Sequence, residues 1–294
     1  MGVRAIFTFM MSRSEFYSCR ILRHLTAACL LFVCGRPKCD GFMVASNETV
    51  PSLNIVNIQH WGEENYNGVW QKLRSIWAYI YSAYAEDYDF FYLGGDDYYL
   101  IVENLRSFLA SEEMVSAAGG EGWPSPLYLG RRVLDRHDLH EVLNHGGPGY
   151  VLNRAALKLL VEKAFMQESC QPYRWKHSED RFLGECFRGV SVNPYDTRDH
   201  NHLHRFHIFT PYQIATGSWG GLGKWVKTYV CFDDKEEECP YGWSTVSEES
   251  ISFHYVQPPL MKQIFAALSG LCEFIPFVEK SSTAVANVRG KGVA

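Results

Sequence analysis

Short apolar segments alternate with longer amphipathic segments along the chain. The apolar segments predict six strands, at residues 5–11, 41–46, 53–58, 89–94, 149–153 and 252–256. Apolar residues between Val69 and Tyr84 recur three or four positions apart, which predicts a helix with one buried face. A second helix is predicted after Asn153, because asparagine is a favoured N-cap residue. Strands that alternate with helices predict an α/β fold, whose ligands gather at the carboxyl ends of the strands.

The order of these elements, without internal repeats or long low-complexity tracts, predicts a single domain over residues 1–280. Residues 281–294 are small and polar, which predicts a flexible tail. The apolar stretch at residues 24–35 is short for a membrane span, so a buried helix is favoured and a signal-peptide core is the alternative. No apolar run reaches the roughly 18 residues that a transmembrane helix needs.

Composition narrows the class of partner. The 294 residues are 47% hydrophobic, which is enough for a large core, and the net charge is only −5. Basic residues form no stripe interleaved with aromatics, so the sequence predicts no nucleic-acid partner. A small molecule or another protein is the expected partner.

The nine cysteines form no CxxC pair, which argues against a zinc ribbon or a thioredoxin-like site. Cys170 with Cys186 and Cys231 with Cys239 are two plausible disulfides, although sequence alone leaves their connectivity open. Asn47 begins the sequon Asn-Glu-Thr in a loop-like stretch, in agreement with a secretory-pathway protein.

Paired carboxylates follow the predicted strand at residues 89–94. Asp96 and Asp97 stand at its carboxyl end, and their oxygens suit Mg²⁺ or Mn²⁺ bound to a substrate diphosphate. The alternative is a plain turn, because Gly-Gly-Asp-Asp is ordinary turn chemistry.

A second acidic pair, Glu179 and Asp180, follows Ser178, which would cap a short helix. Acidic residues in a first helical turn complement the helix dipole, so a structural role is the alternative to that of a general base.

Histidines offer two further candidates. His254 lies inside the predicted strand at residues 252–256, where a buried structural histidine competes with a metal ligand beside Asp97. A rival zinc site is the cluster His200, His202, His204 and His207, for which a solvated surface is the simpler interpretation.

The glycine-rich stretch at residues 144–149 follows no predicted strand and is not a dinucleotide-binding fingerprint. The stretch is also compatible with a loop that lets a ligand approach the backbone closely.

Five segments, in this order, resemble the inverting β-1,3-glycosyltransferases of the fringe and core 1 type, and in particular the glycoprotein N-acetylgalactosamine β-1,3-galactosyltransferases. They are "WQKLRSIWAYIYSAYAEDYDFFYLGGDDYYLIVENLRSFL", "LYLGRR", "GGPGYVLNRAALKLL", "CQPYRWKHSEDRFLGECF" and "ISFHYVQPPLM". The likeness extends from Ala5 to Leu271, and residues 12–35 match the family poorly. It implies a glycosyltransferase A fold, a Rossmann-like mixed sheet flanked by helices, that binds a UDP-sugar through Mn²⁺.

The resemblance also implies roles for individual residues. Asp97 and His254 would be the metal ligands, and Asp180 the catalytic base. Trp225 would stack on the acceptor. The residues expected near the donor are Glu64, Lys72, Asp96 and Tyr255. Gly95 departs from the family, since it replaces the first acidic residue of the triplet that ends at Asp97.

The implied function is transfer of galactose from UDP-galactose to N-acetylgalactosamine linked to Ser or Thr of glycoproteins. Asp180 would take the acceptor proton while the diphosphate departs, so that configuration inverts. The implied location is the Golgi lumen at a membrane, although the family's anchor and stem are not evident in this chain. The expected partners are the donor and a glycan or glycoprotein acceptor, and a homodimer stays open.

Two alternatives to this function are a UDP-N-acetylglucosamine-dependent, fringe-like transferase and an inactive relative that serves as a folding partner. The presence of Asp97, Asp180 and His254 favours an active enzyme.

Overall fold

The computed structural model describes residues 3–10, 39–62, 64–173, 178–232 and 241–268. Its larger sheet contains seven strands of the described chain in the order β10-β6-β9-β4-β1-β2-β3. These strands are β1 (Ala5–Met10), β2 (Gly41–Ser46), β3 (Ile55–Asn57), β4 (Phe90–Gly94), β6 (Tyr128–Gly130), β9 (Tyr150–Asn153) and β10 (Tyr195–Asp196). The sheet is mixed, because β9 runs antiparallel to β4 and β6 whereas β1 to β4 are mutually parallel.

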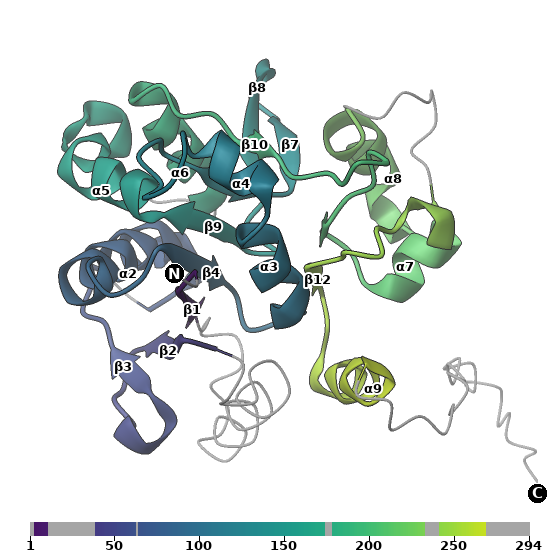
Figure 1. Cartoon of the computed structure of the whole chain (residues 1–294), viewed down its shortest axis with the longest axis horizontal. Coiled ribbons are helices and arrows are strands. Elements are labelled where there is room, and N and C mark those ends of the chain that lie inside the picture. Colours follow the sequence, from purple (N-terminus) through teal and green to yellow (C-terminus); the bar gives the residue numbers. More distant parts are fainter. Residues whose placement is uncertain (1–2, 11–38, 63, 174–177, 233–240, 269–294) are drawn as a thin grey trace, which may run out of the picture.

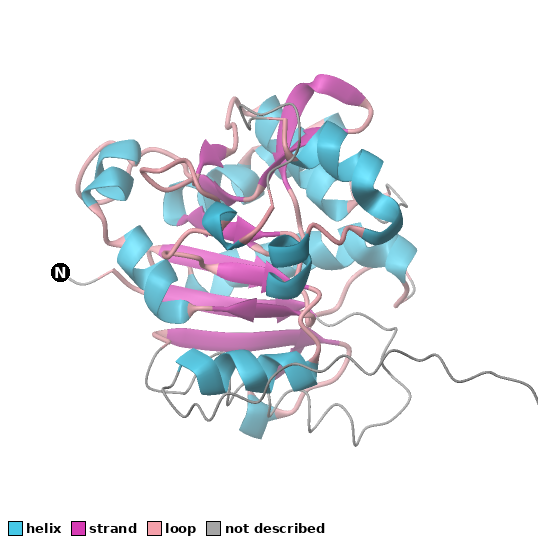
Figure 2. Cartoon of the chain, turned by 90° about the vertical axis from the view of Figure 1, so that its right-hand side faces the viewer, coloured by secondary structure: helices cyan, strands magenta, loops and turns pink. Residues whose placement is uncertain are grey.

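Helices cover both faces of this sheet (Figures 1 and 2). The described α-helices are α2 (Val69–Tyr84), α3 (Val102–Leu109), α4 (Glu112–Ala117), α5 (Arg154–Glu162), α6 (Glu179–Gly189), α7 (Pro211–Thr216), α8 (Gly223–Trp225) and α9 (Pro258–Leu268). Along β4, Phe91 and Leu93 pack with α2, α5 and α6, whereas Phe90 and Tyr92 pack with α3 and α4. This alternation follows from the period of two along a strand, and it creates two cores.

A smaller group of elements packs beside the main sheet and forms a third core. It contains a three-stranded sheet in the order β11-β12-β5 and the hairpin β7-β8, built from β5 (Tyr98–Leu100), β7 (Arg132–Asp135), β8 (Asp138–Asn144), β11 (Phe206–His207) and β12 (Ser252–His254). Figure 1 shows β12, α7 and α8 together on the right, with the β7-β8 hairpin above the main sheet.

The predicted α/β class, a mixed sheet flanked by helices, is confirmed. Each of the six predicted strands is present, although the third is shorter, at Ile55–Asn57, and the sixth ends two residues early, at His254. The helix from Val69 to Tyr84 has the predicted bounds, and the Asn153 side chain accepts a hydrogen bond from the Ala156 N–H at the start of α5.

Two local predictions were wrong. Ser178 precedes α6, but its side chain makes no capping hydrogen bond. The glycine-rich stretch does follow a strand, β8, which ends at Asn144. Periodicity missed β8 because its first half is exposed and polar.

Several sequence features lie outside the described residues, namely the atypical residues 12–35 and the tail at 281–294. None of the described helices is long and apolar enough to cross a bilayer. Asn47, the first residue of the sequon, is exposed in the loop after β2.

Candidate active site

One cleft of about 670 Å³ lies where β4, β9, β12 and α6 meet. The carboxyl end of β4 and the start of β9 lie at the same edge of the sheet, because Leu93 pairs with Tyr150 in an antiparallel register. This register brings the glycine-rich loop before β9 next to the Asp96-Asp97 turn after β4. The cleft therefore occupies the carboxyl edge at which the sequence predicted ligands to bind.

Six of the eight predicted site residues line this cleft: Asp96, Asp97, Asp180, Trp225, His254 and Tyr255. Glu64 and Lys72 are not among the lining residues. They pair with each other, with Lys72 Nζ 3.0 Å from Glu64 Oε2, while His60 Nε2 lies 2.9 Å from Glu64 Oε1. The predicted donor contacts of Glu64 and Lys72 therefore stay predictions.

Asp97 and His254 approach each other through strand pairing. His254 is opposite Tyr98 in the β12-β5 register, and the Val256 N–H donates to the Asp97 carbonyl over 2.8 Å. Tyr255, between His254 and Val256 in the chain, adopts the left-handed conformation with φ 58°, which is uncommon for a non-glycine residue. The result is a distance of 3.3 Å between His254 Nε2 and Asp97 Oδ1.

This pair fits a divalent cation. Two ligands in adjacent octahedral positions, each about 2.1 Å from the ion, lie about 3 Å apart, close to the spacing seen here. The described residues contain no group of three or more His, Cys, Asp or Glu side chains arranged to hold a metal. The chain would thus supply two ligands, leaving the other positions to water and a bound substrate.

The rival histidine cluster does not assemble. His207 is buried, stacks on Phe253 at a centroid distance of 4.5 Å and pairs with Ser250 Oγ at 2.9 Å. His200 and His202 are exposed. The alternative of a zinc site at these histidines has no support among the described residues, whereas the favoured solvated surface holds for His200 and His202 but not for buried His207.

Asp180 is held on the first turn of α6. The Gly146 N–H donates to its Oδ2 over 3.0 Å, and the Arg181 N–H donates to its Oδ1 over 2.8 Å. The same turn carries Glu179, which also lines the cleft. Burial, followed by the charge of Asp180, raises the pKa of Glu179 to about 8.

The glycine-rich loop brings these groups close together because it lacks side chains. A Cβ atom on Gly146 would lie 2.6 Å from Glu179 Oε1, and one on Gly147 would lie 2.3 Å from His254 Nδ1. Alanine at either position would displace a cleft residue. The loop itself is held by Tyr92 and Ser252, whose hydroxyls both donate to the Pro148 carbonyl.

His145 and Tyr66 are among the residues of this cleft that were not predicted from the sequence. His145, directly before the glycines, lies edge-on to Trp225 at 5.7 Å and accepts a hydrogen bond from the Gly147 N–H. Burial lowers its pKa to about 4, while Asp180 acts in the opposite direction. Tyr66 lies on the 3₁₀ turn before α2, where Asn65 caps the Gly68 N–H. The sequence could have indicated His145 by its position next to the glycine-rich loop, and Tyr66 by its position just before α2.

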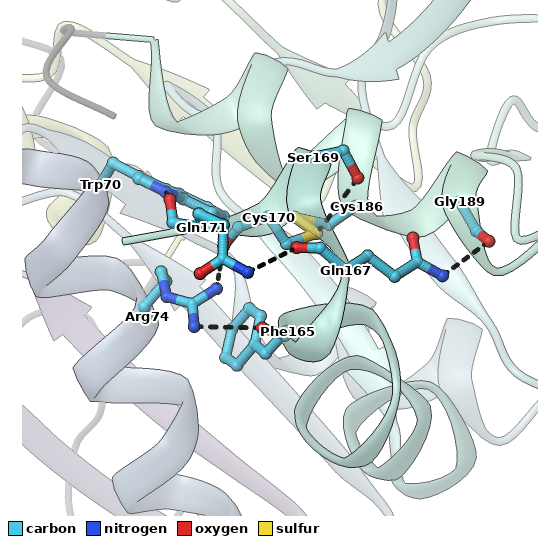
Figure 3. The surroundings of a disulfide bond; sticks show 9 residues. All are labelled: Trp70, Arg74, Phe165, Gln167, Ser169, Cys170, Gln171, Cys186 and Gly189. Atoms are coloured by element: carbon cyan, nitrogen blue, oxygen red, sulfur yellow. Dashed lines mark hydrogen bonds between the residues drawn. A yellow bond between two sulfur atoms is a disulfide. The ribbon is translucent and has the colours of Figure 1, made fainter. Parts of the chain in front are cut away.

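A disulfide fixes α6 to the segment that precedes it (Figure 3). Cys170 and Cys186 are bonded, as predicted, and the Cys170 carbonyl accepts from Arg74 of α2. The Trp70 indole also donates to the Gln171 carbonyl over 3.0 Å. These contacts connect the helix that carries Asp180 to α2. Cys231 is also in a disulfide, and its predicted partner Cys239 lies outside the described residues.

Comparison with known proteins identifies a relative. The chain is 28% identical over 214 residues to glycoprotein-N-acetylgalactosamine 3-beta-galactosyltransferase 1 of Xenopus laevis, a match that covers 72% of this chain and 53% of that protein. The chain thus spans about half the length of this curated relative. No family model matches.

Among solved structures, the catalytic domain of Drosophila beta1,4galactosyltransferase 7 in complex with xylobiose is similar, with a TM-score of 0.33 and 14% identity over 65% of this chain and 64% of that chain. A likeness this distant supports no argument about the site.

Proposed function

Because the chain is homologous to the glycoprotein-N-acetylgalactosamine 3-beta-galactosyltransferases, we propose that it is an inverting, Mn²⁺-dependent β-1,3-galactosyltransferase. Its donor would be UDP-galactose, and its acceptor N-acetylgalactosamine linked to Ser or Thr of a glycoprotein. The observation that carries the proposal is the presence of the Asp97–His254 pair and the oriented carboxylate of Asp180 in one cleft.

The charges of the cleft support a cation-dependent donor site. Five acidic residues, Asp96, Asp97, Asp135, Glu179 and Asp180, line it together with two arginines, Arg136 and Arg181. A donor diphosphate is itself anionic, so a cation bound between it and the carboxylates of Asp96 and Asp97 would favour its binding. Mn²⁺ bound by Asp97 and His254 would balance the diphosphate and stabilise it as the leaving group.

Other residues of the cleft would contact the donor and the acceptor and accept the acceptor proton. Tyr255 lines the cleft next to His254, where it would contact the donor. Trp225 and Leu222 provide an apolar wall on which a sugar ring would stack. Asp180, with both oxygens oriented by backbone N–H groups, would take the proton of the acceptor hydroxyl as it attacks the anomeric carbon. Attack from the face opposite the nucleotide inverts the configuration.

The secretory setting is part of the same proposal. A disulfide at Cys170–Cys186 and an exposed sequon at Asn47 suit an oxidising lumen, and we place the catalytic domain in the Golgi lumen.

Calorimetric titration of UDP, with and without Mn²⁺, tests the donor site in the wild type and in Asp97→Ala. Binding should require both Mn²⁺ and Asp97. Transfer is then assayed with UDP-galactose and UDP-N-acetylglucosamine on a peptide that carries O-linked N-acetylgalactosamine. If only N-acetylglucosamine is transferred, the donor is UDP-N-acetylglucosamine and not UDP-galactose. A folded wild-type protein that binds no UDP would overturn the enzyme proposal and favour an inactive folding partner.

A further inference from the structure

Two carboxyl groups lie side by side in the cleft, although the proposed reaction uses only one. Glu179 and Asp180 are consecutive residues of the first turn of α6, and both line the cleft. Both also face the backbone of Gly146, where a Cβ atom would lie 2.6 Å from Glu179 Oε1 and 3.5 Å from Asp180 Cβ. Two negative charges this close repel each other strongly in a partly buried site.

Among the described residues, more backbone N–H groups stabilise the charge of Asp180 than that of Glu179, whose carboxyl group interacts only with its own N–H. Gly146 and Arg181 donate one backbone N–H to each oxygen of Asp180. Glu179 forms no ion pair with any Lys, Arg or His among the described residues. The nearest guanidinium along the helix, that of Arg181, is already bound by Asp135 at 3.0 Å and by Glu185 at 2.8 Å.

The other titratable groups near Glu179 are tyrosines from three different elements. Tyr66 precedes α2, Tyr128 lies on β6 and Tyr150 lies on β9, and the charge of Glu179 acts on all three hydroxyls. The hydroxyls of Tyr128 and Tyr150 are buried without a hydrogen-bond partner in the described structure. His145 faces Asp180 from the end of β8, and burial keeps it neutral near pH 7. Arg136 and Arg181 also line the cleft, but among the described residues the charge that acts on the Glu179 carboxyl group is that of Asp180.

We propose that Glu179 is a positioning residue that keeps its proton at neutral pH. The two carboxyl groups then hold one proton between them, and Asp180 alone is ionised and able to accept the acceptor proton. The raised pKa of Glu179, about 8, agrees with this arrangement. The inference rests on the proposed function for the role of Asp180.

The proton count of the proposed step is balanced. As the bond from the acceptor oxygen to the anomeric carbon forms and the bond to the nucleotide breaks, the acceptor proton moves to Asp180. The departing diphosphate takes the electron pair of the broken bond. Glu179 neither gains nor loses a proton in this step, and Asp180 later returns its proton to water. A neutral side chain of the same shape at position 179 should therefore preserve the reaction.

The protonation state can be measured without any activity. We would label glutamate side-chain carboxyl groups with carbon-13 and titrate the wild type, Glu179→Gln and Glu185→Gln by NMR. One resonance should titrate near pH 8 in the wild type and in Glu185→Gln, and should be missing from Glu179→Gln. Glu185 is the matched control, because it lies on the same helix but pairs with Arg181. A wild-type spectrum in which every glutamate titrates below about pH 6 would overturn the inference, even if the variants fail to fold.

Kinetics give the second readout. Folded Glu179→Gln should transfer sugar at pH 7 within about threefold of the wild-type rate, and its pH profile should lack an inflection near pH 8 that the wild type shows. A loss greater than about tenfold in folded Glu179→Gln would show that the carboxyl group itself is needed, and would overturn the positioning role. If the wild type transfers no sugar while the resonance still titrates near pH 8, the proposed function fails and the shared proton stands.

Discussion

The imidazole of His254 lies directly against the backbone of Gly147, because a Cβ atom at position 147 would be 2.3 Å from His254 Nδ1. The glycine loop thus supports one face of the imidazole whose Nε2 lies 3.3 Å from Asp97 Oδ1. A residue remote from Asp97 and His254 in sequence therefore packs against one of the two proposed metal ligands. Position 147 needs glycine because any side chain there would occupy the space of the His254 ring.

Gly147→Ala should accordingly weaken Mn²⁺-dependent UDP binding. The added methyl group must displace the His254 ring, and such overpacking costs about 1–3 kcal/mol, or roughly 5- to 150-fold if it falls entirely on metal affinity. Calorimetry with UDP and Mn²⁺ measures the loss. Gly221→Ala is the matched control, because nothing lies within 4 Å of a Cβ atom there. Equal binding by the two variants would remove Gly147 from this role.

Asp180→Asn should abolish transfer while preserving the donor site. The amide oxygen of asparagine still accepts the Gly146 N–H, but the side chain no longer takes a proton at neutral pH. We expect a fall of about 10²- to 10⁴-fold in initial rate and an unchanged affinity for UDP with Mn²⁺. Asp138→Asn, at the exposed start of β8, serves as the control. Wild-type turnover by Asp180→Asn would exclude Asp180 as the base.

Gly95→Asp should tighten metal binding. A Cβ atom on Gly95 would lie 3.3 Å from Asp97 Oδ1, so a carboxylate there would reach the Asp97–His254 pair. Without a cation the two carboxylates repel each other, whereas with Mn²⁺ both become ligands. The melting temperature should therefore fall in chelator and rise more steeply with Mn²⁺ than in the wild type. An identical Mn²⁺ dependence would mean that position 95 does not face the ion.

Much of this architecture follows from local patterns in the sequence. The bounds of α2 were predictable because its apolar residues recur with the period of a buried helix face, and the strand β4 because four buried residues precede a Gly-Gly turn. The short strands β5 and β11 were not, since they have two or three residues and exist only through pairing with β12, far along the chain. Local periodicity carries no information about such partners.

The residues of the site likewise fall into those that the sequence pattern indicated and those that it did not. Asp96 and Asp97 stand out in the sequence because charge follows a buried strand. The approach of His254 to Asp97 depends on the β12-β5 register, so only the resemblance to a known family predicted it. The contacts of Gly146 and Gly147 with Glu179 and His254 depend on three-dimensional spacing, which no residue pattern encodes.

Loss of the Cys170–Cys186 disulfide should destabilise the domain. The bond closes a loop with a sequence separation of 16 residues, for which the chain-entropy estimate is about 3 kcal/mol. Denaturant unfolding of the Cys170→Ala/Cys186→Ala double variant measures the loss of unfolding free energy. A reductant should then act on the double variant only through the remaining disulfides, such as that of Cys231. Wild-type stability in the double variant would show that contacts such as Trp70 to the Gln171 carbonyl hold α6 without the bond.

Half-buried His145 should make the domain sensitive to acid. Its pKa is about 4 in the folded protein, against about 6.5 in an unfolded chain, so the unfolded state binds more protons between these values. Stability should therefore be retained above pH 6.5 and fall as the pH drops towards 4, by up to about 3 kcal/mol from this group. His145→Asn keeps an acceptor for the Gly147 N–H but does not titrate, so its unfolding free energy should fall less over this range.

The control for His145 is His140→Asn, because His140 is exposed on the β7-β8 hairpin. Denaturant unfolding of both variants at several pH values, in the absence of metal, isolates the contribution of the buried ring. The charge of Asp180 raises the pKa of this ring, whereas those of His254, Arg131 and Arg136 lower it. A slope in His145→Asn equal to that of the wild type would mean that the negative charge of Asp180 offsets the cost of burying a charged imidazole. In that case His145 would enter the proposed reaction as a cation beside the base.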